Sequence, residues 1–162
     1  MTNPKDNLYT ESNRVFFRLE KAATDEVIEW GGDPNLRTAA GIDWQRAKMF
    51  EATGGTMRQM AITEDTTTNQ SDLTDLKTEL AADGLSRTTV TVTSTTSDSK
   101  VTLSASFQYT GGSTVTVARA SICSDLTDND ASHDSHFLLA DVSPVAVMDS
   151  NDTLSIDWEC NL

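Results

Sequence analysis

Residues 101–109 read Val-Thr-Leu-Ser-Ala-Ser-Phe-Gln-Tyr, so every second side chain is apolar. A period of two places the apolar side chains on one face of a β-strand and the polar side chains on the other. The same alternation recurs at Val90 and Val92, at Val115 and Val117, and at Leu154, Ile156, Trp158 and Cys160. These patterns predict several strands that each bury one face.

Short polar segments separate these strands at residues 96–99, 110–113 and 150–152, and they contain Ser, Thr, Gly, Asn and Asp. These residue types favour tight turns. Connections this short cannot form parallel crossovers, so the strands are expected to pair antiparallel. The chain is therefore predicted to be mainly β, as an antiparallel β-sandwich of jelly-roll or immunoglobulin-like type.

The N-terminal part differs in composition from the rest of the chain. Residues 1–12 are polar and predict an arm, whereas residues 15–19 and 26–30 predict two short strands joined by a polar turn. We therefore divide the chain into an N-terminal arm and hairpin over 1–34, expected to be an assembly contact, and a sandwich domain over 35–162.

One or two short helices are expected inside the sandwich domain. Residues 36–52 place apolar side chains at helical spacing, and the glycines at 54–55 end this run. A second, shorter helix is predicted between Ser71, a favourable N-cap residue, and Gly84, which supplies a left-handed C-terminal residue. Residues 57–63 predict a further strand.

The charge of the chain limits its partners. It contains 25 Asp and Glu against 12 Lys and Arg, a net charge of -13, and such a surface repels nucleic acid. Asp outnumbers Glu and Arg outnumbers Lys, which suits a chain that works in concentrated salt, where screening removes self-repulsion. The first twenty residues contain no apolar signal segment, and no run approaches eighteen apolar residues, so no membrane contact is predicted.

The residues that could perform chemistry form no recognised catalytic or cofactor-binding pattern. Cys123 and Cys160 lie far apart, without the spacing of a zinc or redox motif. Two buried thiols are the preferred reading of this pair, and one disulfide is the alternative. The chain has no Gly-x-Ser-x-Gly elbow, phosphate-binding glycine loop or His-Glu-x-x-His motif. We therefore expect a protein that is not an enzyme and needs no cofactor.

The segment 125–136 combines imidazoles with carboxylates. Asp128, Asp130, His133 and His136 are the residue types that bind divalent metals, and they form the candidate metal site of this chain. A solvated acidic loop explains the same residues, and no metal is the preferred reading. As a long polar loop, the segment could also contact a receptor, a protein or a glycan on a host surface.

The tryptophans divide into core and interface candidates. Trp44 and Trp158 lie on predicted apolar faces, whereas Trp30 precedes two glycines in the N-terminal hairpin. A hairpin alone cannot shield its apolar side chains from water. The predicted assembly interface consists of Val15, Phe16, Phe17 and Trp30.

Four parts of the sequence carry a resemblance to a known family. They are Ala39-Ala-Gly-Ile-Asp-Trp44, Arg58-Gln-Met-Ala-Ile-Thr63, Leu76-Lys-Thr-Glu-Leu80 with Asp83-Gly-Leu-Ser-Arg87, and Asp149-Ser-Asn-Asp-Thr-Leu-Ser-Ile-Asp-Trp158. Read in order, they resemble a family of virion structural proteins of tailed viruses, which is found in bacterial phages and in viruses of halophilic archaea.

This resemblance implies a noncatalytic component on the outside of a virion, either a capsid decoration or a vertex turret subunit. A tail baseplate or tail-fibre module that binds a host-surface receptor is the alternative. The expected partners are other virion proteins, such as the major capsid protein or tail proteins, and further copies of the chain in a cyclic homo-oligomer, because repeated lattice sites impose symmetry.

Overall fold

Strands form all the regular elements that the structure describes, and no helix occurs among those residues. The computed structural model describes residues 13–34, 36–37, 59–66, 76, 78–94, 100–123 and 136–161. The strands are β1 (Asn13–Lys21), β2 (Glu26–Pro34), β3 (Leu36–Arg37), β4 (Gln59–Thr63), β5 (Thr88–Thr89), β6 (Thr91–Ser94), β7 (Lys100–Gln108), β8 (Val115–Cys123), β9 (His136–Met148) and β10 (Thr153–Asn161).

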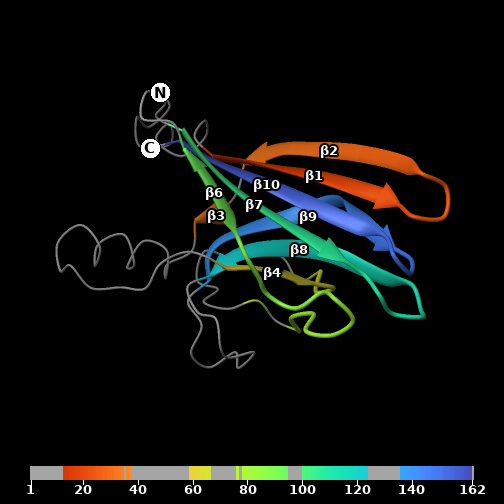
Figure 1. The fold of residues 1–162 in the computed structure, drawn as a ribbon. Coiled ribbons are helices and arrows are strands. Elements are labelled where there is room, and N and C mark those ends of the chain that lie inside the picture. The colour runs from red at the N-terminus through yellow and green to blue at the C-terminus, as the bar shows by residue number, and fades with distance from the viewer. Residues whose placement is uncertain are drawn as a thin grey trace, which may run out of the picture.

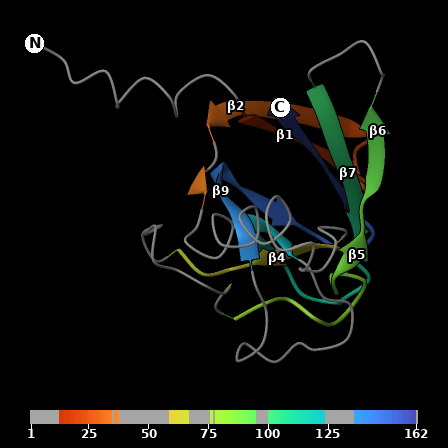
Figure 2. The same cartoon turned by 90° about the vertical axis from the view of Figure 1, so that its left-hand side faces the viewer.

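These strands form two sheets that face each other as two layers (Figure 1), and Figure 2 shows the same layers from the side. Sheet A has the order β2-β1-β10-β7-β6, and sheet B has the order β3-β9-β8-β4-β5. Neighbouring strands pair antiparallel throughout both sheets. The predicted antiparallel β-sandwich is therefore confirmed.

The chain crosses repeatedly between the two sheets. Residues 109–114 connect β7 of sheet A to β8 of sheet B, and residues 149–152 connect β9 of sheet B to β10 of sheet A. At the two sides of the sandwich, β2 continues into β3 and β5 continues into β6, so edge strands switch sheets there. The predicted turns at 110–113 and 150–152 thus join the two layers instead of closing hairpins within one sheet.

The core lies between the sheets, and the alternating residues of the central strands of sheet A fill much of it. Burial of each large apolar side chain contributes about 1.5–3 kcal/mol. On β7 and β10, the buried core residues are Leu103, Ala105, Phe107, Leu154, Ile156 and Trp158. The period of two in the sequence predicted this face correctly for both strands.

The two sheets differ in how their outer faces are covered. Every residue of β4 is buried, and polar residues such as Arg119 and Ser121 of β8 are buried as well. A second apolar cluster, separate from the main core, joins Leu76 to Ala61, Cys123 and Leu139 of sheet B. Sheet B is thus buried on both faces over β4, residues 119–123 of β8 and residues 138–140 of β9, whereas Asp141, Val145 and Val147 of β9 are exposed. On sheet A, side chains of the outer face reach solvent.

The helix predicted up to Gly84 is wrong over residues 78–84. Thr78 has a positive φ of 50°, and Glu79 pairs with Thr63 of β4 as an isolated β-bridge. Leu76 and Leu80 pack against different apolar clusters, which one helical stripe could not do. Gly84 does adopt a left-handed conformation, at φ 85°, but in a turn.

The helix predicted over residues 36–52 begins instead with β3, which pairs with β9. Tertiary pairing at the edge of sheet B therefore overrides the helical spacing at Leu36. The remainder of that prediction, and residues 71–75 of the shorter one, lie outside the described residues.

Strand β9 was missing from the sequence prediction. Pro144 lies within it, and proline is normally excluded from strands because it cannot donate to the ladder. The structure accommodates Pro144 where the β8–β9 register shifts, because Val117 pairs with Ala146 while Arg119 pairs with Asp141. Because this irregularity interrupts the alternation of apolar residues along β9, the sequence does not show that β9 contributes to the core.

The predicted N-terminal hairpin is confirmed as β1 and β2, and it is part of sheet A. β1 lies between β2 and β10 and pairs with β10 from Asn13 to Glu20. Its residues Val15, Phe17 and Leu19 belong to the main core. The hairpin therefore helps to hold the sandwich together, whatever contacts residues 1–34 make in an assembly.

Candidate functional site

The outer face of β1, β2 and β10 is the most distinctive surface among the described residues. Side chains alternate along β1, so that Phe16 and Arg18 point outward while their neighbours enter the core. The strand register places Phe16 between Gly31 of β2 and Asp157 of β10. A second row on the same face, one step along the strands, consists of Glu29, Arg18 and Ser155.

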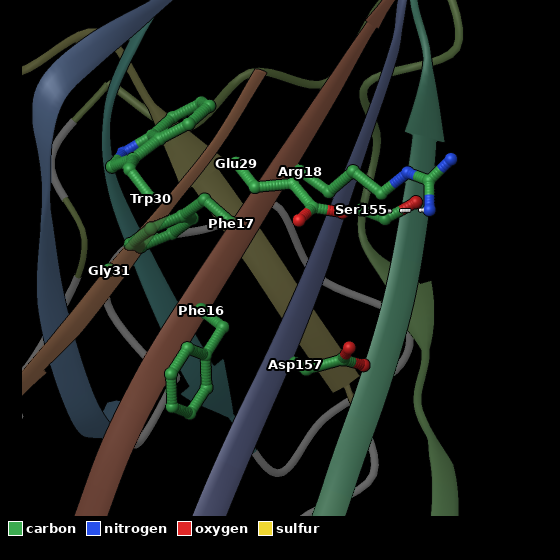
Figure 3. A pocket seen from close by; sticks show the side chains of 8 residues that line it. All are labelled: Phe16, Phe17, Arg18, Glu29, Trp30, Gly31, Ser155 and Asp157. Atoms are coloured by element: carbon green, nitrogen blue, oxygen red, sulfur yellow. Dashed lines mark ion pairs between the residues drawn. The ribbon is translucent and has the colours of Figure 1, made fainter. Parts of the chain in front are cut away.

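This face is hollowed beside Phe16. The hollow has a volume of about 490 Å³, which lies within the usual range of small-molecule sites. Figure 3 shows the Phe16 ring apart from the stacked rings of Phe17 and Trp30. The residues that line the hollow are Phe16, Phe17, Arg18, Glu29, Trp30, Gly31, Ser155 and Asp157.

Glycine creates the space beside Phe16. Gly31 and Gly32 both have positive φ values, 121° and 93°, which side chains other than glycine rarely tolerate. A Cβ atom at Gly31 would collide with the carbonyl oxygen of Val15. The β1–β2 register shifts at the same place, so the glycines form a β-bulge that leaves no side chain opposite Phe16.

Polar groups around Phe16 are only partly engaged by other residues. Arg18 forms ion pairs with Glu20 at 2.8 Å and with Glu29 at 3.7 Å, and Figure 3 marks the latter. Ser104 donates a hydrogen bond of 2.6 Å to Oδ1 of Asp157. Because a guanidinium has five N–H donors and a carboxylate has two acceptor oxygens, both groups retain unused bonding capacity.

A second, smaller hollow of about 240 Å³ adjoins the first at Arg18. Its walls include Glu20 and Lys21 at the end of β1, Asp25 in the β1–β2 turn, Asn151 in the connection before β10 and Thr153 at the start of β10. The hollowed surface thus follows β1 along its outward face for several residues.

The structure separates the four residues of the predicted assembly interface. Val15 and Phe17 are buried in the core, and Trp30 is half-buried and stacks on Phe17 with a ring separation of 5.6 Å. Phe16 is exposed to 37% of its full area. Of the four, Phe16 is therefore the side chain most available to another molecule, and its assembly role stays a prediction.

A cluster around Asp152 fixes one end of the sandwich. The buried carboxylate of Asp152 accepts hydrogen bonds of 2.8 Å from the backbone N–H groups of Ala22 and Asp149, and it lies 2.7 Å from Nζ of Lys21. Asp149 also contacts Lys21, at 3.2 Å, and accepts a hydrogen bond from Thr114. These contacts tie together the β1–β2 turn and both nearby connections between the sheets.

The ionisation of this cluster follows from its contacts. Burial alone would raise the pKa of Asp152, but the hydrogen bonds from Lys21, Asp149 and Ala22 outweigh it and hold this pKa below its ordinary value. Burial alone would lower the pKa of Lys21, but the two carboxylates raise it above its usual range. Hydrogen bonds from Thr114 and Lys21 likewise lower the pKa of Asp149.

A buried ion pair stabilises the loop that covers sheet B. The guanidinium of Arg87 donates from Nε and Nη2 to the two carboxylate oxygens of Glu79, at 2.7 and 2.6 Å, and both side chains are almost entirely buried. This bidentate geometry is the strongest form of such a pair. Neither residue lines a hollow described above, which favours a structural role.

The candidate metal residues are not brought together by anything that the structure describes. Asp128, Asp130 and His133 lie outside the described residues, and His136 begins β9 opposite Cys123. No group of His, Cys, Asp and Glu within the described ranges could hold a metal ion. The absence of a metal, which is the preferred reading of this segment, stays a prediction.

The two cysteines are thiols and do not form a disulfide with each other. Cys123 is buried in sheet B, where its Sγ lies 3.7 Å from the carbonyl oxygen of Gln59, and Cys160 is half-buried in sheet A. This outcome agrees with the preferred thiol reading of the sequence analysis, except that Cys160 is only partly buried.

None of the described residues forms a helix with the length and apolarity needed to cross a membrane. Comparisons of the chain with family models, with curated proteins and with solved structures find no match. The resemblance to virion proteins therefore stays a prediction from the sequence motifs. The class that the fold defines is an acidic antiparallel β-sandwich with one solvated sheet face.

Sequence reasoning singled out Phe16, Phe17 and Trp30, but not Gly31 or the polar residues that line the hollow with them. The period of two along β1 would have separated Phe16 from Val15 and Phe17, since adjacent residues of a strand point to opposite faces. No local signal could have placed Asp157 beside Phe16, because their contact depends on the pairing of β1 with β10 across the whole length of the chain.

Proposed function

We propose that this chain is a noncatalytic structural protein on the outside of a tailed virus particle that infects a halophilic archaeon. Its proposed station is the capsid, as a decoration or a vertex turret subunit. Other virion proteins, the major capsid protein first among them, and further copies in a cyclic homo-oligomer are its proposed partners.

The observation that carries this proposal is the unequal covering of the two sheets. Sheet B is buried on both faces over β4 and the adjoining parts of β8 and β9, whereas the outer face of sheet A carries mostly Ser, Thr, Asp, Glu and Arg side chains in solvent, together with Phe16 and Val27. A subunit displayed on a particle needs one such solvated face. The net charge of -13 supports display in concentrated salt, where an acidic surface remains hydrated without strong self-repulsion.

Fractionation of purified particles tests this role. Heads and tails are separated after mild disruption, and the chain is measured in each fraction by quantitative mass spectrometry. Enrichment in the head fraction, at a copy number that is a multiple of the capsid symmetry, is the expected result. If the chain is missing from intact particles, the proposal is wrong.

The hollow beside Phe16 favours the second candidate, a tail baseplate or fibre module that binds a host-surface receptor. An exposed aromatic ring flanked by polar groups provides both contact area and hydrogen bonds. Under this alternative, the chain is enriched in the tail fraction, and the isolated protein competes with virus for adsorption to host cells. If the chain is found in the head fraction and does not compete with virus for adsorption, this alternative is excluded.

A further inference from the structure

We infer that the hollow beside Phe16 binds a neutral pyranose ring, the unit of most glycans. This assignment goes beyond the proposed virion role, and it concerns the isolated chain whether that chain belongs to heads or tails. It also differs from the receptor loop predicted over 125–136, because the hollow lies on the outer face of β1, β2 and β10.

The Phe16 ring supplies the apolar part of the site. Pyranose rings carry C–H groups on one face and hydroxyl groups around their rim, so they bind best where a flat apolar surface is surrounded by polar atoms. Phe16 is an exposed ring whose neighbours on this face, Arg18 of β1 and Ser155 and Asp157 of β10, are polar. Gly31 and the adjacent bulge leave room for a ligand against it.

Unused polar atoms around Phe16 suit the hydroxyl rim of such a ring. Among the described residues, Oδ2 of Asp157 has no hydrogen-bond partner, since Ser104 donates to Oδ1. Arg18 uses two of its nitrogens in ion pairs with Glu20 and Glu29, and its other N–H groups remain available as donors. The carboxylate of Asp157 can accept a hydrogen bond from a sugar hydroxyl beside Phe16. The guanidinium of Arg18 extends across Ser155, away from the Phe16 ring (Figure 3), and can donate to a ligand that reaches along the hollow.

The charges of the hollow favour a neutral ligand over a charged one. Its ionisable lining residues are Arg18, Glu29 and Asp157, one cation and two anions. An anionic sugar or a phosphate would meet a net negative site. A lysine side chain would meet Arg18, and phenylalanine is a weaker partner for cations than tryptophan.

The affinity of this site should be low, because the hollow is shallow and one aromatic ring provides most of its apolar contact. A ligand the size of one hexose gains little per atom on such a surface, which corresponds to a Kd on the order of 1 mM. Repetition of the chain on a particle would raise the overall affinity by multivalency.

Saturation-transfer NMR on the isolated full-length chain tests the inference. The probes are methyl β-D-galactopyranoside, methyl α-D-glucopyranoside and methyl α-D-mannopyranoside, each at about ten times the expected Kd. We expect saturation to be transferred from the protein to the ring protons of at least one of these sugars. Phe16→Ala and Phe16→Leu should weaken binding about tenfold or more, because both remove the flat ring, whereas Phe16→Tyr should retain it.

Val92→Ala is the matched control, because Val92 is also an exposed apolar residue of sheet A but lies on the edge strand β6. Far-UV circular dichroism confirms that each variant is folded. The inference is overturned if no probe receives saturation, or if Phe16→Ala binds as well as the original chain. It is also overturned if Nα-acetyl-lysine methylamide binds at Phe16 while the sugars do not. Particle fractionation is unaffected by any of these results, so failures of the two proposals are distinguishable.

Discussion

Asp152 shows how one buried carboxylate organises the turn that contains it. Its side chain is 1% exposed, and three donors from two separate turns surround it. Its own backbone carbonyl accepts a hydrogen bond of 2.9 Å from Tyr109, in the connection between β7 and β8. Loss of its charge would therefore loosen the β1–β2 turn and the 149–152 connection together.

We expect Asp152→Asn to lower the free energy of unfolding by about 2–3 kcal/mol. The side-chain nitrogen of asparagine cannot accept the hydrogen bonds that one of the two carboxylate oxygens accepts in the original chain. Urea denaturation at pH 7 measures the change. Asp149→Asn is the matched control, since Asp149 belongs to the same cluster but is exposed, and it should have a much smaller effect. Equal losses in the two variants would contradict the central role of Asp152.

The same contacts predict an acid dependence of stability. The pKa of Asp152 in the folded chain lies below its ordinary value, which is about 3.9 in an unfolded chain. Its contribution is therefore complete above about pH 5 and is lost as the pH falls through the lower, folded pKa. Urea denaturation between pH 5 and pH 2.5 should show a smaller decline for Asp152→Asn than for the original chain. Parallel declines would show that other carboxylates cause the acid sensitivity.

At the scale of single elements, the glycine bulge in β2 controls the edge of sheet A. Gly31→Ala should destabilise the chain by about 1–3 kcal/mol, because a Cβ atom there meets the backbone of β1 and the φ of 121° is unfavourable for alanine. Gly112→Ala is the control, since a Cβ atom at Gly112 would meet nothing within 4 Å. Thermal unfolding measures both, and a midpoint for Gly31→Ala at or above that of Gly112→Ala would contradict the account.

Strands with regular alternation were predictable from the sequence, and irregular elements were not. The residues of β7 and β10 follow a period of two because one face packs in the core and the other meets solvent. Pro144 breaks that pattern in β9. Leu76 and Leu80 imitate a helical stripe, yet tertiary packing draws them into different clusters.

The partners of each strand were also beyond sequence reasoning. Alternation shows which residues share a face, but it does not show which strand lies alongside. The connections at 109–114 and 149–152 cross between sheets, so β10 pairs with β1 and β7 instead of β9. The candidate site depends on that pairing, because Phe16 and Asp157 meet only through it.

The position of β1 predicts the outcome of a truncation. Removal of residues 1–34 takes away β1 and β2 and exposes the edge of β10, together with core residues such as Ile156 and Trp158. We expect this truncated chain to lack a cooperative unfolding transition, whereas removal of residues 1–12 leaves every described strand pairing in place and should preserve it. Circular dichroism with thermal unfolding measures both. A cooperative transition in the shorter chain would show that β1 is dispensable for folding.

At the scale of the whole molecule, net charge governs the response to salt. The net charge of -13 creates repulsion that destabilises the compact state in dilute buffer. At about 1 M salt the Debye length is about 3 Å, so little of the repulsion between exposed carboxylates remains. The ion pairs of Arg18 are screened as well, but exposed pairs contribute at most about 1 kcal/mol each.

Screening removes more repulsion than attraction, so we expect the stability of the folded chain to rise with the concentration of sodium or potassium chloride. Thermal unfolding of the isolated chain at about 0.05 M and at molar salt measures the effect, and light scattering must accompany it, because assembly would also raise the midpoint. Sodium chloride and potassium chloride should act alike if screening is the cause, whereas a specific cation site would distinguish them. A midpoint that stays constant or falls as salt increases would remove the halophilic host from the proposed function, but the sandwich and its solvated face would remain.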